Sequence, residues 1–180
     1  ALATCESVAV SLSALSSSML PVKEIIHLDG IYLAVGLFPS KLKASVNIET
    51  WFLGVPASIL RAASERTANR PGGCLRIIER RVLWLVSTLA HEFPVTLHAS
   101  LYECLTNMLE GGAAAEGGDV TVRLTAVNAI KALVERCGFG VDEFTRSQNS
   151  LGRIVSALYA VLREVEKFET RVSIVSLVSD

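Results

Sequence analysis

Three histidines mark the places where catalytic or metal-binding chemistry could be sought. His91 is followed by Glu92, but His98 comes seven positions after His91, whereas a zinc-protease helix needs its two histidines four positions apart on one face. His27 precedes Asp29 by two positions, yet no motif places a Ser or Cys nucleophile beside this pair. We interpret all of these residues as polar groups on helix surfaces or solvated helix ends. The sequence therefore predicts no catalytic residue and no metal ligand.

Glycines and cysteines could also carry chemistry, through phosphate loops or metal sites. The glycines at Pro71–Gly73 and in the GGAAAEGG run Gly111–Gly118 lack the Gly-Lys-Ser/Thr ending of a phosphate loop. No cofactor is expected. The cysteines show neither CxxC spacing nor Cys/His ligand spacing, and we interpret them as reduced, buried residues of an intracellular protein; they are Cys5, Cys74, Cys104 and Cys137.

The composition restricts the classes of partner. Hydrophobic residues make up 51% of the 180 residues, and the formal net charge is −1. Such a charge creates no field that would attract nucleic acid or an anionic membrane, and no stretch is apolar and long enough to cross a bilayer. The segment 1–20 is diluted by Glu6 and several serines, so it does not match a signal peptide. Because the chain starts in an apolar run and stops in a helical pattern, we expect a piece of a longer protein.

Helical periodicity and chain breakers divide the sequence into eight helical segments. Asn47 and Asp119 are good N-caps for two of them. Pro56 should kink or break the helix that contains it, and Gly111–Gly118 is expected to be a flexible surface loop. The segments cover about 4–18, 21–38, 47–67, 74–92, 94–110, 120–137, 149–165 and 169–180.

The eight segments suggest an all-α fold of four antiparallel helical hairpins. An arginine recurs in the first half of three second helices, at Arg81, Arg123 and Arg171, after 42 and then 48 positions. These spacings favour HEAT or armadillo units of about 40–47 residues. We therefore predict one α-solenoid segment with apolar surface exposed at both ends, made of hairpins at about 4–38, 47–92, 94–137 and 149–180.

A family resemblance makes the prediction more specific. The run Asp119–Arg123, followed by Ala126 and Ala129, resembles the second helix of HEAT repeats. The segment Glu79–Val86 is similar to the Arg-Arg-x-x-x-Trp-Leu helix in the middle of importin-β superfamily proteins (karyopherins) of the importin-eleven branch. The order of motifs continues through Phe93-Pro94, Leu101–Glu103 and Asp142–Phe144, so the resemblance covers most of residues 22–178. It implies residues that stack one repeat on the next, namely Asp119, Arg123, Arg81 and Arg171.

The same resemblance implies a nuclear transport receptor rather than an enzyme. Such a receptor would bind cargo proteins, the small GTPase Ran through repeats outside this segment, and Phe-Gly nucleoporins. It would act in the nucleus, in the cytoplasm and at the nuclear pore, without membrane insertion or direct contact with nucleic acid. The residues that contact cargo are not identified by the sequence.

Two other readings share the repeat-level features. The chain could be a HEAT scaffold of another kind, such as a phosphatase regulatory subunit or a trafficking adaptor, or the docking array of an enzyme whose catalytic part lies elsewhere.

Two groups of residues also allow a structural and a functional interpretation. The polar face of the segment 74–92 carries Arg76, Glu79, Arg80 and Arg81. The three arginines are expected to pair locally on this solvated face, with neighbours such as Glu79, but could bind phosphate or an acidic partner. Trp51 and Trp84 are expected in the core, but could line a Phe-Gly pocket.

Overall fold

The computed structural model of the chain describes residues 22–39, 47–64, 75–113, 119–137, 150–166 and 168–179. Over these residues the protein is an all-α helical solenoid, and no strand occurs among them. A short 3-10 helix, η1 (Ala90–Glu92), follows the central helix. The described α-helices are α2 (Val22–Leu37), α4 (Ile48–Leu53), α5 (Val55–Ser64), α6 (Leu75–Leu89), α7 (Val95–Ala113), α8 (Val120–Cys137), α10 (Ser150–Glu164) and α11 (Phe168–Ser179).

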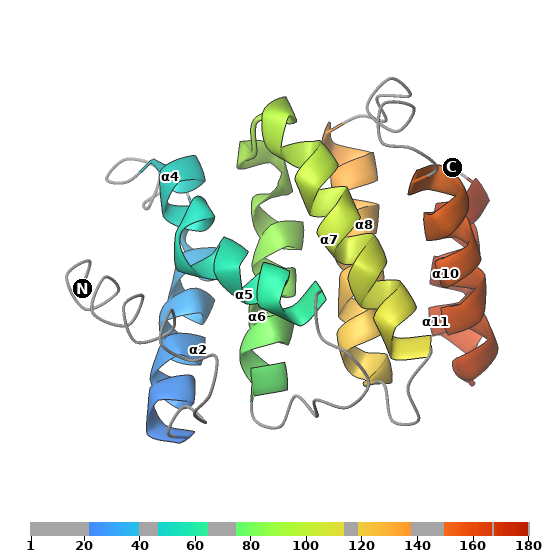
Figure 1. The fold of residues 1–180 in the computed structure, drawn as a ribbon, viewed down its shortest axis with the longest axis horizontal. Helices are drawn as coiled ribbons and strands as arrows, with labels where there is room; N and C mark the ends of the chain where they lie inside the picture. The colour runs from blue at the N-terminus through green and yellow to red at the C-terminus, as the bar shows by residue number, and fades with distance from the viewer. Residues whose placement is uncertain are drawn as a thin grey trace.

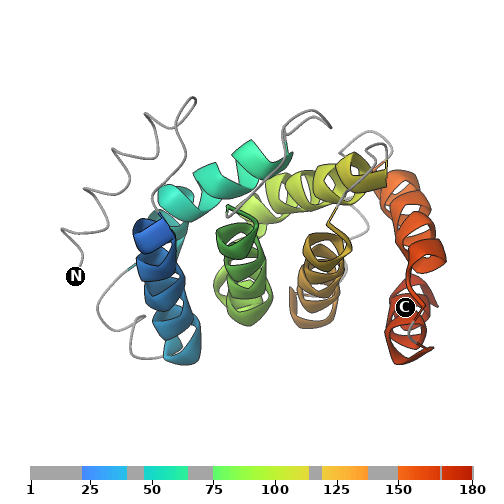
Figure 2. The same ribbon diagram turned by 90° about the horizontal axis from the view of Figure 1, so that it is seen from below.

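The helices form two rows that follow a shallow arc (Figures 1 and 2). In one row α2 packs on α6 and α6 packs on α8. In the other row α5 packs on α7 and α7 packs on α10. Figure 2 shows α4, α5, α7 and α10 along the outer side of the arc, with α2, α6, α8 and α11 on the inner side. Sequence-distant helices of the same row thus lie side by side, as in stacked hairpins.

Local sequence signals explain where the third predicted segment starts and breaks. The Asn47 side chain accepts a hydrogen bond from the Thr50 backbone N–H at 3.0 Å, which confirms the predicted N-cap. The helix breaks at Gly54, whose backbone N–H donates to the Trp51 carbonyl. Pro56 then occupies the first turn of α5, where its missing N–H costs no hydrogen bond. The predicted break near Pro56 is confirmed, and it lies just before the proline.

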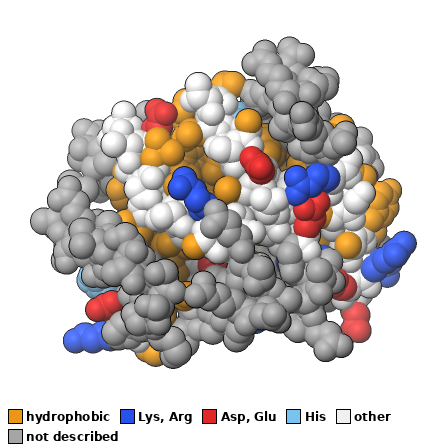
Figure 3. All heavy atoms as spheres, in the orientation of Figure 1, with side chains coloured by type: hydrophobic (Ala, Val, Ile, Leu, Met, Phe, Trp, Pro, Cys, Tyr) orange, Lys and Arg blue, Asp and Glu red, His pale blue; other side chains and the backbone are white. Residues whose placement is uncertain are grey.

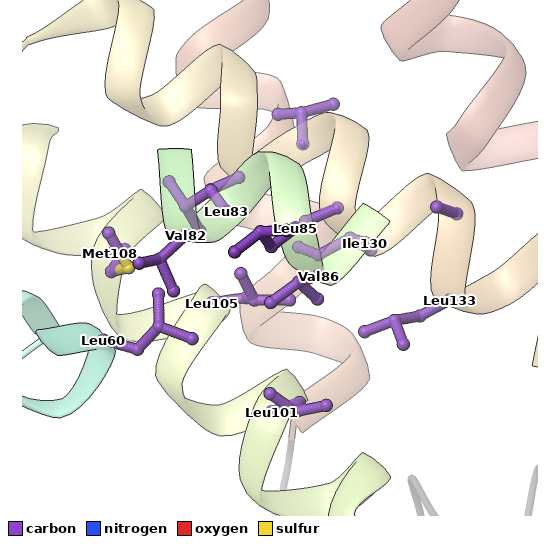
Figure 4. Packing of buried hydrophobic residues seen from close by; sticks show 14 of the residues in the cluster. Leu60, Val82, Leu83, Leu85, Val86, Leu101, Leu105, Met108, Ile130 and Leu133 are labelled. Carbon is purple, nitrogen blue, oxygen red and sulfur yellow. The ribbon is translucent and has the colours of Figure 1, made fainter. Parts of the chain in front are cut away.

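Helix α6 lies at the centre of the hydrophobic core. It contacts α2, α5 and α8, so it buries more than the usual single stripe. Val82, Leu83, Leu85 and Val86 are completely buried, together with Leu89. Figure 4 shows Val82, Leu83, Leu85 and Val86 among side chains of three other helices: Leu60 of α5, Leu101, Leu105 and Met108 of α7, and Ile130 and Leu133 of α8.

The structure differs from the sequence-based expectations at two points. Residues 111–113 continue α7, so the predicted loop Gly111–Gly118 starts too early; an added helical turn satisfies backbone groups that a loop would leave to water. Glu79 was expected on the polar face of α6 but is only 3% exposed, because α6 has neighbours on several sides. The predicted helix 4–18 and the linker 138–148 lie outside the described residues.

Candidate functional site

Arginines connect neighbouring helices at several points along the solenoid. Arg81 of α6 binds Asp29 of α2 with two hydrogen bonds, Nε to Oδ1 at 2.7 Å and Nη2 to Oδ2 at 3.2 Å. Its guanidinium also lies over the Trp84 ring, 5.2 Å from the ring centroid. A bidentate, stacked arginine fixes distance and orientation together. This contact therefore sets the register between α2 and α6.

Asp119 joins α6 to α8 at the N-terminal end of α8. Its Oδ1 accepts the Thr121 backbone N–H at 2.9 Å, as an N-cap does, and its Oδ2 lies 3.4 Å from Nη1 of Arg76. Burial acts to raise the pKa of this carboxyl, but the hydrogen bonds from Thr121 and Val122 and the charge of Arg76 outweigh it. The pKa of Asp119 is therefore lowered below its ordinary value of 3.8.

Two substitutions of Asp119 distinguish the stability contributed by its N-cap from that contributed by its ion pair with Arg76. We expect Asp119→Ala to lower the free energy of unfolding by about 1 kcal/mol through the lost cap. Asp119→Asn keeps a good cap and loses only a partly exposed pair, so it should cost less than about 0.5 kcal/mol. Because the folded-state pKa is lowered, the stabilisation by the charged form is full above about pH 5 and disappears as the pH falls through that pKa.

Urea unfolding of both variants and the parent at pH 7 and pH 3 measures these terms. The difference between the parent and Asp119→Asn should shrink at pH 3. Equal losses in Asp119→Ala and Asp119→Asn at pH 7 would show that the cap contributes nothing.

Arg123 is the most buried charged side chain among the described residues, at 1% exposure. Its Nε donates to the Leu109 carbonyl of α7 at 3.1 Å, and its Nη1 binds the Glu164 carboxylate at the end of α10. It therefore connects α8 with both α7 and α10. The Nη2 atom is buried and has no hydrogen-bond partner among the described residues.

Two further arginines complete the set of inter-helix contacts. Arg136 near the end of α8 donates to the Ser87 and Thr88 carbonyls at the C-terminal end of α6. A cation at this position satisfies terminal carbonyls and interacts favourably with the helix dipole. Arg153 of α10 binds Glu110, and its Nη2 donates to the side chain of Asn107 on α7 at 2.8 Å. Glu110 in turn raises the pKa of Arg153.

The predicted stacking residues do not form one uniform ladder. Arg81 contacts Asp29 of α2, Arg123 contacts Glu164 of α10, and Arg171 is exposed without a hydrogen bond or ion pair to another described residue. The N-cap acid, Asp119, accepts a hydrogen bond from Arg76, which is not one of the arginines aligned with Arg123.

Sequence reasoning did not identify three of the acids in these pairs, namely Asp29, Glu110 and Glu164. The expectation that Arg76 and Arg81 pair locally overlooked their partners on α8 and α2. A usable signal exists in the spacing, because the pairs Arg76–Asp119, Glu110–Arg153 and Arg123–Glu164 are 43, 43 and 41 positions apart. A search of the sequence for opposite charges one repeat length apart would have identified these three pairs.

The residues considered for catalysis lie in different settings. His27 is exposed, His91 lies 3.1 Å from Glu92, and His98 is buried with its Nε2 3.2 Å from the Phe93 carbonyl. The prediction that His98 belongs to a solvated helix end is wrong, because α7 folds this turn against the core. Within the described ranges, no group of three or more His, Cys, Asp or Glu side chains could hold a metal ion.

Both tryptophans contact the core from half-buried positions. Trp51 packs edge-on against Tyr32 with 5.9 Å between ring centroids, and the Trp84 ring covers Gly36 of α2.

On the outer side of the arc, acidic and basic side chains alternate over the described surface, without a large area of one sign (Figure 3). None of the helices that the structure describes has the length and apolarity to span a membrane.

The two rows of helices joined by inter-helix arginines define an α-helical solenoid. The chain is similar to importin-11 from Mus musculus and from Homo sapiens, at 26% identity to each over 152 residues. The match covers 84% of this chain but only 14% of each relative. No protein-family model and no solved structure matches the chain. The similarity supports a relationship to the importin-β family.

Proposed function

We propose that the chain is a HEAT-type segment of a nuclear transport receptor that binds cargo proteins for Ran-dependent transport. The observation that carries this proposal is the 26% identity to importin-11 across 84% of the chain, on a fold that is a helical solenoid. The segment would act as a binding array without catalysis. Its hairpins, taken as about 4–38, 47–92, 94–137 and 149–180, would be stacked by Arg81, Asp119 and Arg123.

The inter-helix contacts support a role in presenting surface. A solenoid stacks short units so that each contacts mainly its neighbours, which leaves long continuous faces for partners. Here the arginines fix neighbouring units through side chains such as Asp29 and Glu164. In the proposed receptor, cargo would bind such a face, Ran would bind other repeats, and Phe-Gly nucleoporins would contact the surface.

Nucleotide-selective binding of Ran tests the proposal directly. The full-length gene product should bind immobilised Ran loaded with a non-hydrolysable GTP analogue at least about tenfold more tightly than Ran loaded with GDP. The 180-residue chain alone is the matched control and should bind neither form, because the Ran-binding repeats are expected outside it. Equal binding of both nucleotide forms by the full-length protein would contradict the transport role.

A further inference from the structure

We draw no further inference here: the strongest candidate, the partly exposed apolar stripe of Leu151, Val155, Tyr159 and Leu162 on the side of α10 opposite Arg153, is an unpartnered helix face, and nothing in the structure shows what covers it.

Discussion

Gly36→Ala should lower the free energy of unfolding by about 2 kcal/mol. A Cβ at this position would lie 2.2 and 2.3 Å from two atoms of the Trp84 ring and 3.1 Å from Cδ2 of Leu85. These distances are far inside van der Waals contact, so α2 and α6 must separate or the indole must leave its site. Overpacking of this kind costs about 1–3 kcal/mol. The loss would appear in urea unfolding as a lower midpoint with an unchanged slope.

Gly30→Ala is the matched control, because it is the same substitution on the same helix. Nothing lies within 4 Å of its Cβ position, so the better helix propensity of Ala should stabilise the chain by about 0.5–1 kcal/mol. In a Trp84→Ala background the two shortest contacts are removed and only the 3.1 Å contact with Leu85 remains, so Gly36→Ala should then cost much less. Two glycine variants with effects of the same sign would contradict the proposed close approach of α2 and α6.

Arg123→Met should destabilise the chain by about 2–4 kcal/mol. The guanidinium is buried and donates to the Leu109 carbonyl and the Glu164 carboxylate. Hydrogen bonds that involve a charged group contribute about 1.5–3 kcal/mol each. Met fills part of the volume but donates no hydrogen bond. Because the side chain of Glu164 is 40% exposed, water can solvate the remaining carboxylate, which keeps the cost below that of a wholly buried charge.

The contrast with Arg153 tests whether burial decides the size of this effect. Arg153 also joins two helices through a carboxylate, but its side chain and that of Glu110 are 40% and 38% exposed. Exposed pairs contribute little, so Arg153→Met should cost less than about 1 kcal/mol. Thermal unfolding of both variants under one condition measures the difference. Similar losses in the two variants would argue that Arg123 contributes no more than a surface ion pair.

Much of the secondary structure could be predicted, because its causes are local. The N-cap at Asn47, the cap at Asp119 and the break near Pro56 depend on backbone groups within a few residues. The position of α6 followed from its apolar periodicity. The predicted end of α7 is three residues early, since a glycine pair permits helix as well as loop when its neighbours are helical.

The candidate site could be predicted only in part. Arg81 and Arg123 were identified by spacing and resemblance, and both contact neighbouring helices in the structure. Their partners, Asp29 and Glu164, are 52 and 41 positions away, and nothing in the local pattern specifies which of many acids lies opposite. Arg171 was predicted from the same spacing and resemblance, but it makes no such contact within the described residues.

Hydrophobic periodicity and capping act over a few residues, so the amino-acid sequence predicts that this chain forms helices, where most of them begin and end, and which residues are candidates for stacking. The packing of helices that are distant in sequence brings specific charges together, buries Glu79 and places Gly36 under Trp84. These outcomes depend on the register between helices, which packing over the whole core determines.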